Sequence, residues 1–497
     1  MNRRRLLLSP YPVWLALFFA LTCCTASAAP GDASQAVLGR WQGRMADPGN
    51  SVTVGLEFKK SEGDIQAFFF CEEWDLDSIP IGNATLKDNE IQTVLFTGTL
   101  AGNSESISGT LDFGPMGVPD LKLPLVLSKA GAVPSAAPAA ASRLATARWT
   151  FPTGGEVWGS PSLSDGVLYI GSEDGFLYAL DAKTGGLKWR FQAAKGVRSR
   201  PAAGGQLVCF LSDDGFLYAV ERSSGKLRWK FDTHTALVPH SALGDSDSRW
   251  DYLQSSPTFD GNLVIVGSGN SNLYAVDVTN GHEKWHYTTG DCVRSSPVVR
   301  NGTVYFGSWD NSVYALDSQT GAEKWKFDTK GIVQATPAVL GNTLIIGSRY
   351  PYVFALDKAT GVEKWRFNYF GSWVESSAAV TADTVYVGSS DYLHLFAIDL
   401  TNGKRKWAFK TSGYSWSSPA VEGDVVYIGT ARASKRHPKD GGDVYAVDAK
   451  TGREVWRFQT DRQGPSFLKG VVSSPAVGNG LVYFGALDGK VYAVPTK

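Results

Sequence analysis

The chain has 497 residues, which is too long for one ordinary domain and indicates two or three. Hydrophobic residues make up 43% of it and 54 residues are glycine, a composition typical of a β-rich globular protein with many tight turns. Basic and acidic residues balance at 48 each, so the net charge gives no reason to expect binding to nucleic acid or to an anionic membrane surface.

Residues 1–28 are predicted to be a signal peptide. Arg3, Arg4 and Arg5 precede an apolar stretch that ends near Cys24, and Ala26-Ser27-Ala28 has the small residues of a cleavage site. The apolar stretch is too short to span a bilayer, so we expect no transmembrane segment in the mature chain. Twin-arginine export and lipidation at the cysteines both stay open as variants. The sequence thus predicts a periplasmic protein, with association to the outer membrane as one form of it.

Residues 29–130 are predicted to form a small all-β domain. The pattern Gly-x-Trp-x-Gly at residues 39–43 opens it, and alternating runs such as 52–58 and 91–100 follow, separated by glycine-containing turns. This pattern indicates an antiparallel meander, a sandwich or a barrel. Residues 131–146, rich in alanine, proline and serine, are predicted to be a flexible linker.

Residues 147–497 repeat one pattern. In its clearest copy Ala315, Asp317, Gly321 and Trp325 have the form Ala-x-Asp-x-x-x-Gly-x-x-x-Trp. The alternating residues before the Asp indicate a strand, the Asp and Gly favour a turn, and the Trp of the next strand must face a buried surface. Half-buried hairpins of this kind must stack on one another. The seven full copies end at Trp189, Trp229, Trp285, Trp325, Trp365, Trp407 and Trp456.

The ends of this region complement each other. An eighth unit begins at Pro475, but the chain stops at Lys497 before the last strand of that unit. Residues 148–151 read as an outer strand with no preceding turn. Because a sheet edge left open favours aggregation, we predict that this first strand completes the last unit. The prediction is an all-β fold in which an eight-bladed β-propeller of four-stranded antiparallel blades follows the small β domain.

The repeated motif resembles the tryptophan-docking motif of quinoprotein-type, PQQ-like propellers, and the resemblance covers about residues 147–497. One branch of that family contains dehydrogenases of alcohols or sugars that use pyrroloquinoline quinone (PQQ) and calcium. The other branch contains non-catalytic propellers such as BamB, which holds protein partners in the outer-membrane β-barrel assembly machinery. The resemblance therefore implies either an enzyme or a scaffold.

The irregular connections are all predicted to lie on one face of the ring. Trp229 to Pro257 is 28 residues where 12 is usual, Trp456 to Pro475 is 19, and the loop around residues 430–442 is also lengthened. Function tends to reside in loops carried by a rigid scaffold, so this face is the candidate site. The funnel mouth on this face should be lined by the residue three positions before the proline of each Ser-Pro step or its counterpart. These residues are Trp158, Arg198, Gln254, Arg294, Gln334, Glu375, Trp416 and Val472.

Two interpretations of these mouth residues stay open. In the first, the charged members are solvated or paired with one another at a polar mouth. In the second, two Trp faces and two Arg side chains hold a flat anion or a peptide segment.

Other residues are weaker candidates, and we predict no catalytic or metal-binding residue. Asp245, Asp247 and Asp251 have a calcium-like spacing, but Arg249 lies where such a loop needs an oxygen ligand. His234 and His240 lack metal spacing. A basic loop is read as a soluble loop or a docking contact; it contains Arg432, Lys435, Arg436, His437 and Lys439.

The cysteines weigh against the enzyme. Cys71, Cys209 and Cys292 remain after cleavage, whereas the dehydrogenases that this chain resembles usually carry an adjacent, disulfide-bonded pair. We therefore expect a monomeric scaffold in the cell envelope that binds envelope proteins, peptide segments or a ligand and needs no cofactor. The alternative is a dehydrogenase that depends on PQQ and calcium.

Overall fold

The structure is a computed structural model that describes residues 36–47, 50–61, 64–71, 76–102, 105–112, 122–129, 143–233, 254–350, 352–368, 374–390, 393–433, 442–461 and 468–497. The predicted signal peptide lies outside the described residues, as does most of the predicted linker. The chain divides into two compact units, Met1–Pro138 and Ala139–Lys497.

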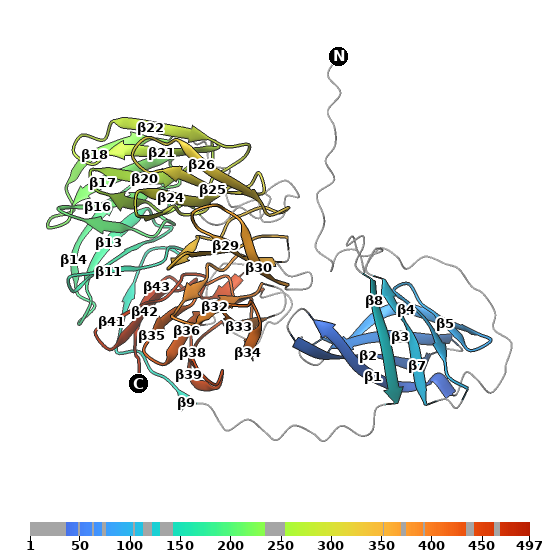
Figure 1. Cartoon of the computed structure of the whole chain (residues 1–497). Helices are drawn as coiled ribbons and strands as arrows, with labels where there is room; N and C mark the ends of the chain where they lie inside the picture. Colours follow the sequence, from blue (N-terminus) through green and yellow to red (C-terminus); the bar gives the residue numbers. More distant parts are fainter. Residues whose placement is uncertain are drawn as a thin grey trace, which may run out of the picture. The chain divides into compact units, whose positions relative to one another are not determined.

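The first unit is a closed antiparallel barrel, drawn in blue in Figure 1. Each strand pairs with the next along the chain, and Trp41 of the first strand pairs with Lys129 of the last. The Trp41 side chain is fully buried and donates its Nε1–H to the Val37 carbonyl at 2.7 Å. Of the three arrangements open to the sequence, the structure has the barrel. Its strands are β1 (Gly39–Asp47), β2 (Asn50–Ser61), β3 (Asp64–Cys71), β4 (Leu76–Lys87), β5 (Glu90–Gln92), β6 (Phe96–Leu100), β7 (Ser106–Asp112) and β8 (Lys122–Lys129).

The second unit is a propeller of eight antiparallel blades, which confirms the predicted fold (Figure 1). Four blades come first. Blade 1 is β11 (Ser162–Ser164), β12 (Val167–Gly171), β13 (Phe176–Asp181) and β14 (Leu187–Gln192); blade 2 is β15 (Ala202–Gly204), β16 (Leu207–Leu211), β17 (Phe216–Glu221) and β18 (Leu227–Asp232). Blade 3 is β19 (Thr258–Asp260), β20 (Leu263–Gly267), β21 (Asn272–Asp277) and β22 (Glu283–Thr288); blade 4 is β23 (Val298–Arg300), β24 (Thr303–Gly307), β25 (Ser312–Asp317) and β26 (Glu323–Asp328).

The other four blades repeat this order. Blade 5 is β27 (Ala338–Leu340), β28 (Thr343–Gly347), β29 (Tyr352–Asp357) and β30 (Glu363–Asn368); blade 6 is β31 (Ala379–Val380), β32 (Thr384–Gly388), β33 (His394–Asp399) and β34 (Arg405–Lys410). Blade 7 is β35 (Ala420–Glu422), β36 (Val425–Gly429), β38 (Asp443–Asp448) and β39 (Glu454–Gln459); blade 8 is β41 (Ala476–Gly478), β42 (Leu481–Gly485), β43 (Lys490–Pro495) and β10 (Trp149–Pro152).

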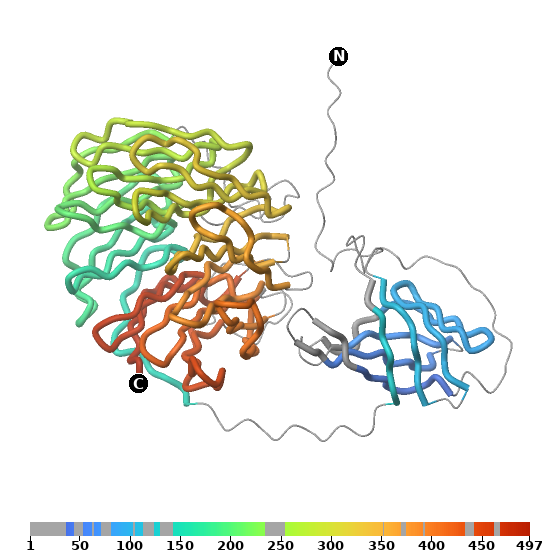
Figure 2. The backbone as a smooth tube through the Cα atoms, in the orientation of Figure 1, coloured from blue at the N-terminus to red at the C-terminus, as the bar shows by residue number. Residues whose placement is uncertain are grey.

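The first strands of the second unit close the ring. Strand β10 pairs antiparallel with β43, from Trp149 opposite Ala493 to Pro152 opposite Lys490. The short strand β9 (Arg143–Leu144), within the segment assigned to the linker, adds to blade 7 in parallel with β39. Figure 2 shows the cyan start of the unit beside its red end. The start of the propeller therefore bridges the last two blades.

Tryptophans join neighbouring blades. Each donates its indole N–H to a backbone carbonyl of the next blade, over 2.9 to 3.2 Å. Trp149 of blade 8 bonds Ala182 of blade 1, and Trp456 of blade 7 bonds Thr496 beyond β43. The set of contacts therefore runs around the whole ring without a break. The other six donors are Trp189, Trp229, Trp285, Trp325, Trp365 and Trp407.

A glycine substitution tests these contacts. Gly321 has φ +74°, and a Cβ added there would lie 2.7 Å from the Trp285 ring, whereas Gly302 in the same blade has φ +70° and open space around it. Gly302→Ala should cost about 1–2 kcal/mol for the left-handed backbone alone. Gly321→Ala should cost about 1–3 kcal/mol more, because the indole must move. Urea unfolding followed by tryptophan fluorescence measures both, and equal losses would contradict the packing role of Gly321.

Candidate functional site at the mouth of the central channel

A channel of about 830 Å³ runs through the centre of the ring. Every blade contributes to its wall, through its first strand or through the residues just before that strand. All the positions predicted at the funnel mouth lie on its wall: Trp158, Arg198, Gln254, Arg294, Gln334, Glu375, Trp416 and Val472. The sequence repeat therefore located the mouth, and the structure shows what these side chains contact.

One polar cluster joins blades 1, 2 and 3. The Arg198 guanidinium donates two bonds to Glu173, Nε–H at 2.5 Å and Nη2–H at 2.7 Å, and Asp213 lies 3.3 Å from Nε. Gln254 donates its amide to the other oxygen of Asp213. Burial opposes the charge of Arg198, but the bond to Glu173 and the charges of Asp213 and Glu173 outweigh it, so the pKa is raised. Arg198 is thus a buried, fixed cation.

A second polar cluster joins blades 4, 5 and 6. Arg349 donates Nε–H to Glu375 at 2.7 Å and Nη2–H to the Gln334 side-chain oxygen at 3.0 Å. Its guanidinium carbon also lies 5.2 Å from the centre of the Trp309 ring. The side chains of Arg349 and Glu375 are each 8% exposed, so this ion pair is held away from bulk solvent.

An aromatic sector occupies the part of the mouth formed by blades 1, 7 and 8. Tyr414 and Trp416 stack with ring centres 5.7 Å apart, and together with Trp158 and Val472 they belong to one apolar cluster. Trp158 donates its Nε1–H to Glu156 at 2.9 Å, and Trp416 donates to the Ser390 hydroxyl at 2.8 Å. A polar partner therefore orients each indole at one edge, while the face of Trp416 stacks on Tyr414.

Two lengthened connections meet at this sector. Strand β37 (Ala431–Ala433) begins the long loop of blade 7, and β40 (Leu468–Gly470) lies in the connection from blade 7 to blade 8. The two strands pair as a separate antiparallel ribbon, and Tyr414 forms a bridge to Ala431. Two of the three insertions predicted on one face thus form one structure beside the aromatic sector. Most of the third, between Trp229 and Pro257, lies outside the described residues.

The structure distinguishes partly between the two interpretations of the charged mouth residues. Arg198 and Glu375 are ion-paired, but their partners are Glu173, Asp213 and Arg349 rather than each other. Arg294 lines the channel and is 6% exposed. These partners were not predicted from the sequence; each lies two residues beyond the end of the second strand of its blade. Variation at that position from unit to unit is the signal that would have found them.

Several weaker candidates lie outside the described residues. These are Asp245, Asp247, Asp251, His234 and His240, together with Lys435, Arg436, His437 and Lys439 of the basic loop. Arg432 is described and lies in β37. Within the described part of the chain no three His, Cys, Asp or Glu residues come together as a metal site.

Cys209 and Cys292 are free thiols. Cys209 is fully buried in β16, where burial raises the pKa of its thiol, as expected for a core residue. Cys292 is partly buried and its thiol donates to the Gly269 carbonyl at 3.1 Å.

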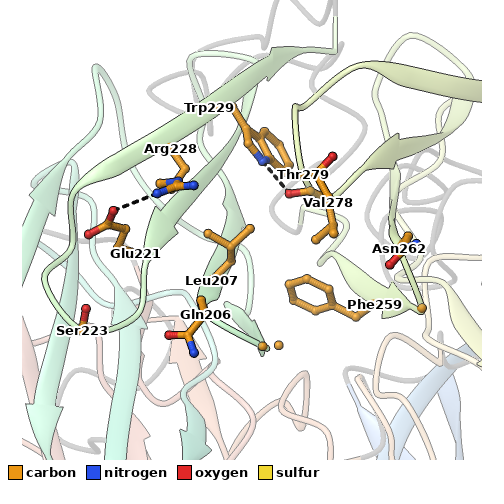
Figure 3. A pocket seen from close by; sticks show the side chains of 13 residues that line it. Gln206, Leu207, Glu221, Ser223, Arg228, Trp229, Phe259, Asn262, Val278 and Thr279 are labelled. Carbon is orange, nitrogen blue, oxygen red and sulfur yellow. Dashed lines mark hydrogen bonds and ion pairs between the residues drawn. The ribbon is translucent and has the colours of Figure 1, made fainter.

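A second cavity of about 740 Å³ lies between blades 2 and 3. Figure 3 shows that its charged members, Arg228 and Glu221, face each other and that Trp229 bonds Val278 across the blades. Arg228 donates to Glu221 at 3.2 Å. Phe259 packs where a Cβ on Gly204 would lie 2.7 Å from its ring. The charged side chains of this groove are paired with each other, so the channel mouth stays the stronger candidate.

The sequence also matches a protein family. The model of the family described as outer membrane protein assembly factor BamB matches residues 131–308, 214–337 and 309–497. Together these ranges span the whole propeller and most of the chain. The chain belongs to this family of PQQ-like propellers. The resemblance found in the repeated motif is thereby confirmed.

The fold of this chain is similar to solved structures of a BamB protein and of quinoprotein-type dehydrogenases. BamB from Moraxella catarrhalis is 19% identical, with a TM-score of 0.56, 71% of this chain covered and 98% of that one. Quinohemoprotein alcohol dehydrogenase from Comamonas testosteroni is 16% identical, with a TM-score of 0.56 and coverage of 71% and 76%. A europium-containing methanol dehydrogenase is 15% identical, with a TM-score of 0.54 and coverage of 70% and 93%. At such identities the likeness shows the propeller fold alone.

No curated protein sequence matches this chain at a significant level. Among the described residues, no helix has the length and apolar character needed to cross a membrane.

Proposed function

We propose that this protein is an exported propeller that acts as a binding scaffold in the cell envelope, in the manner of the family to which it belongs. A protein or peptide segment binds at the channel mouth, with its apolar side chains on the sector of Trp158, Tyr414 and Trp416. The observation that carries the proposal is the mouth itself, where a regular framework presents different side chains from each blade. Aromatic residues beside fixed charges are typical of interfaces that hold a protein partner.

Unused hydrogen-bonding groups support the same proposal. Arg198 Nη1, Gln254 Oε1 and Gln334 Nε2 are buried and have no hydrogen-bond partner within the described part of the chain. Buried polar groups are nearly always paired in folded proteins, so such atoms gathered at one mouth favour a bound partner or ligand there.

The alternative is a dehydrogenase that uses PQQ and calcium. Calcium needs six to eight oxygen ligands, including carboxylates that are free to bind it. At this mouth Glu173 and Asp213 bind Arg198, Glu375 binds Arg349, and Glu156 accepts the Trp158 N–H. The donor set of the described mouth therefore does not fit a calcium-bound quinone, which supports the scaffold over the enzyme.

Site-specific cross-linking tests the scaffold. A photo-reactive residue at Tyr414, half-buried at the mouth, is expected to give discrete adducts with envelope proteins or peptides in intact cells. The same residue at Val362, which is 64% exposed in a tight turn between β29 and β30, is the control and should give none of these adducts. Adding Trp416→Ser should weaken capture at Tyr414 about tenfold or more, because aromatic residues dominate interface energies. Identical adducts at both positions, or capture unchanged by Trp416→Ser, would contradict the proposal.

The enzyme alternative has its own test. Purified full chain is incubated with calcium and PQQ, and the bound chromophore and dye reduction with alcohols or sugars are measured. We expect neither, and stoichiometric uptake with turnover would replace the scaffold by the dehydrogenase.

A further inference from the structure

Arg200 stands in a ring of hydroxyl-bearing residues inside the channel, two residues beyond the mouth position of each unit. We call this ring the waist. Its members precede the proline, or its counterpart, in every unit, and all of them line the channel. Unit 2 alone carries a charged side chain there. The waist residues are Ser160, Arg200, Ser256, Ser296, Thr336, Ser377, Ser418 and Ser474.

Hydrogen bonds between blades fix the orientation of six waist hydroxyls. A waist N–H donates to the hydroxyl oxygen of the neighbouring blade at 2.8 to 2.9 Å, beginning with Arg200 N–H to Ser256. Each of these oxygens acts as an acceptor, so its own O–H is left to donate. No described residue accepts these protons, and the hydroxyls line the channel. The waist is therefore rich in hydrogen-bond donors. The hydroxyls concerned are those of Ser160, Ser256, Ser296, Ser377, Ser418 and Ser474.

The Arg200 guanidinium has no counter-ion within the described part of the chain. Its side chain is exposed to the channel, and no described carboxylate forms an ion pair with it. Glu375 is the only carboxylate among the described residues that line the channel, and Arg349 binds it at 2.7 Å. The channel walls surround Arg200 and lower the pKa of the guanidinium by desolvation, although arginine stays charged at neutral pH. A cation without a counter-ion, set among hydrogen-bond donors, favours an anion beside it.

A purely structural role does not account for the arginine. In the other units this position carries a hydroxyl that can receive the neighbouring N–H, whereas Arg200 offers no oxygen to the N–H of Ser160. Arginine at this position therefore removes the hydroxyl acceptor for the Ser160 N–H. The backbone N–H bond from Arg200 to Ser256 does not depend on the arginine side chain.

We propose that the waist is a binding site for a small oxyanion of the carboxylate or phosphate class. The planar fork of Arg200 matches two oxygens of such an anion, and the hydroxyls of the adjacent blades, Ser160 and Ser256, donate to the oxygens that remain. The site lies deeper in the channel than the mouth residues and does not depend on the partner proposed there.

Titration of the full chain with inorganic phosphate and with acetate tests the site. In chloride buffer of constant ionic strength, calorimetry and the thermal unfolding midpoint should show saturable binding to the wild-type protein. Arg200→Ser restores the hydroxyl of the other units, so it should fold, and it should weaken binding about tenfold or more because a charge-assisted pair is lost. Arg200→Gln serves as a second variant without the charge. Arg300→Ser removes an exposed arginine at the end of β23 and should bind as the wild type does.

The binding measurements on the wild type and the three variants either support or overturn the waist site. Saturable binding that Arg200→Ser and Arg200→Gln abolish and Arg300→Ser leaves intact supports the waist site, and a crystal soaked in phosphate should then show the anion at Arg200. Wild-type protein that binds neither anion at millimolar concentration, or binding that both Arg200 variants retain, overturns it. The cross-linking at Tyr414 reports on the mouth separately, so failure of one proposal is distinguishable from failure of the other.

Discussion

Replacing residues 143–152 by a glycine–serine segment of the same length is expected to abolish the stable monomeric propeller. The replacement removes β9 and β10, and with β10 the outer partner of β43 from Lys490 to Ala493. It also removes Trp149, whose indole bonds Ala182 of blade 1 and packs on Gly185. Trp149 and Phe151 pack against the apolar cluster between blades 8 and 1.

The expected loss is large on two grounds. Removing a large aromatic side chain from such packing costs about 3–5 kcal/mol, and two are removed here. That sum approaches the whole stability of an ordinary domain, about 5–15 kcal/mol. In addition β43 becomes an open edge, which promotes association between chains.

Thermal unfolding and light scattering after size exclusion measure the outcome. The control replaces residues 131–140, in the predicted linker, by the same glycine–serine sequence, and it should leave both the midpoint and the mass unchanged. A monomer with a wild-type midpoint after replacement of 143–152 would show that the ring does not depend on its closing strand.

Arg349→Met is expected to cost about 3–5 kcal/mol of the free energy of unfolding. Glu375 lies 2.7 Å from Arg349 with each side chain 8% exposed, so the substitution leaves a carboxylate enclosed without its partner. Gln334 loses its bond to Arg349 as well. The measurement is denaturant unfolding of the full chain.

Two comparisons separate the buried pair from a general effect of lost charge. The double variant Arg349→Met with Glu375→Met removes both charges and should recover most of the loss, since an apolar pair of similar size is often as stable as a buried ion pair. Arg366→Met breaks a pair with Glu363 in which the arginine is 49% exposed, and it should cost about 1 kcal/mol or less. A cost at Arg349 no greater than the cost at Arg366 would contradict the assignment of a desolvated pair.

The barrel shows one limit of sequence reasoning. The alternation of apolar and polar residues within β2 or β6 can be recognised in the sequence, because successive side chains of a strand point to opposite faces. In Phe96–Leu100 the residues are alternately buried and exposed, as this pattern predicts. The pairing of Trp41 with Lys129 that closes the barrel joins residues far apart in the sequence. No local pattern carries that information, so the sequence left a sandwich and a meander open.

The mouth shows a second limit. The position of Arg198 and Glu375 on the channel wall followed from the repeat, because every unit places the same position at the same level. The sequence did not predict their partners. Asp213 and Arg349 lie in the turns between the second and third strands of their blades, away from the repeated position at the mouth.

The sequence by itself determined the count of the blades, the strand that closes the ring and the level of the mouth residues. All of these depend on a spacing that repeats along the chain, and such a spacing can be measured in the sequence without knowledge of the fold. Only the tertiary structure decided which charges pair, that β37 and β40 form one ribbon beside Trp416, and that Arg200 faces a ring of hydroxyls. These depend on distances between blades, which exist only once the ring has closed.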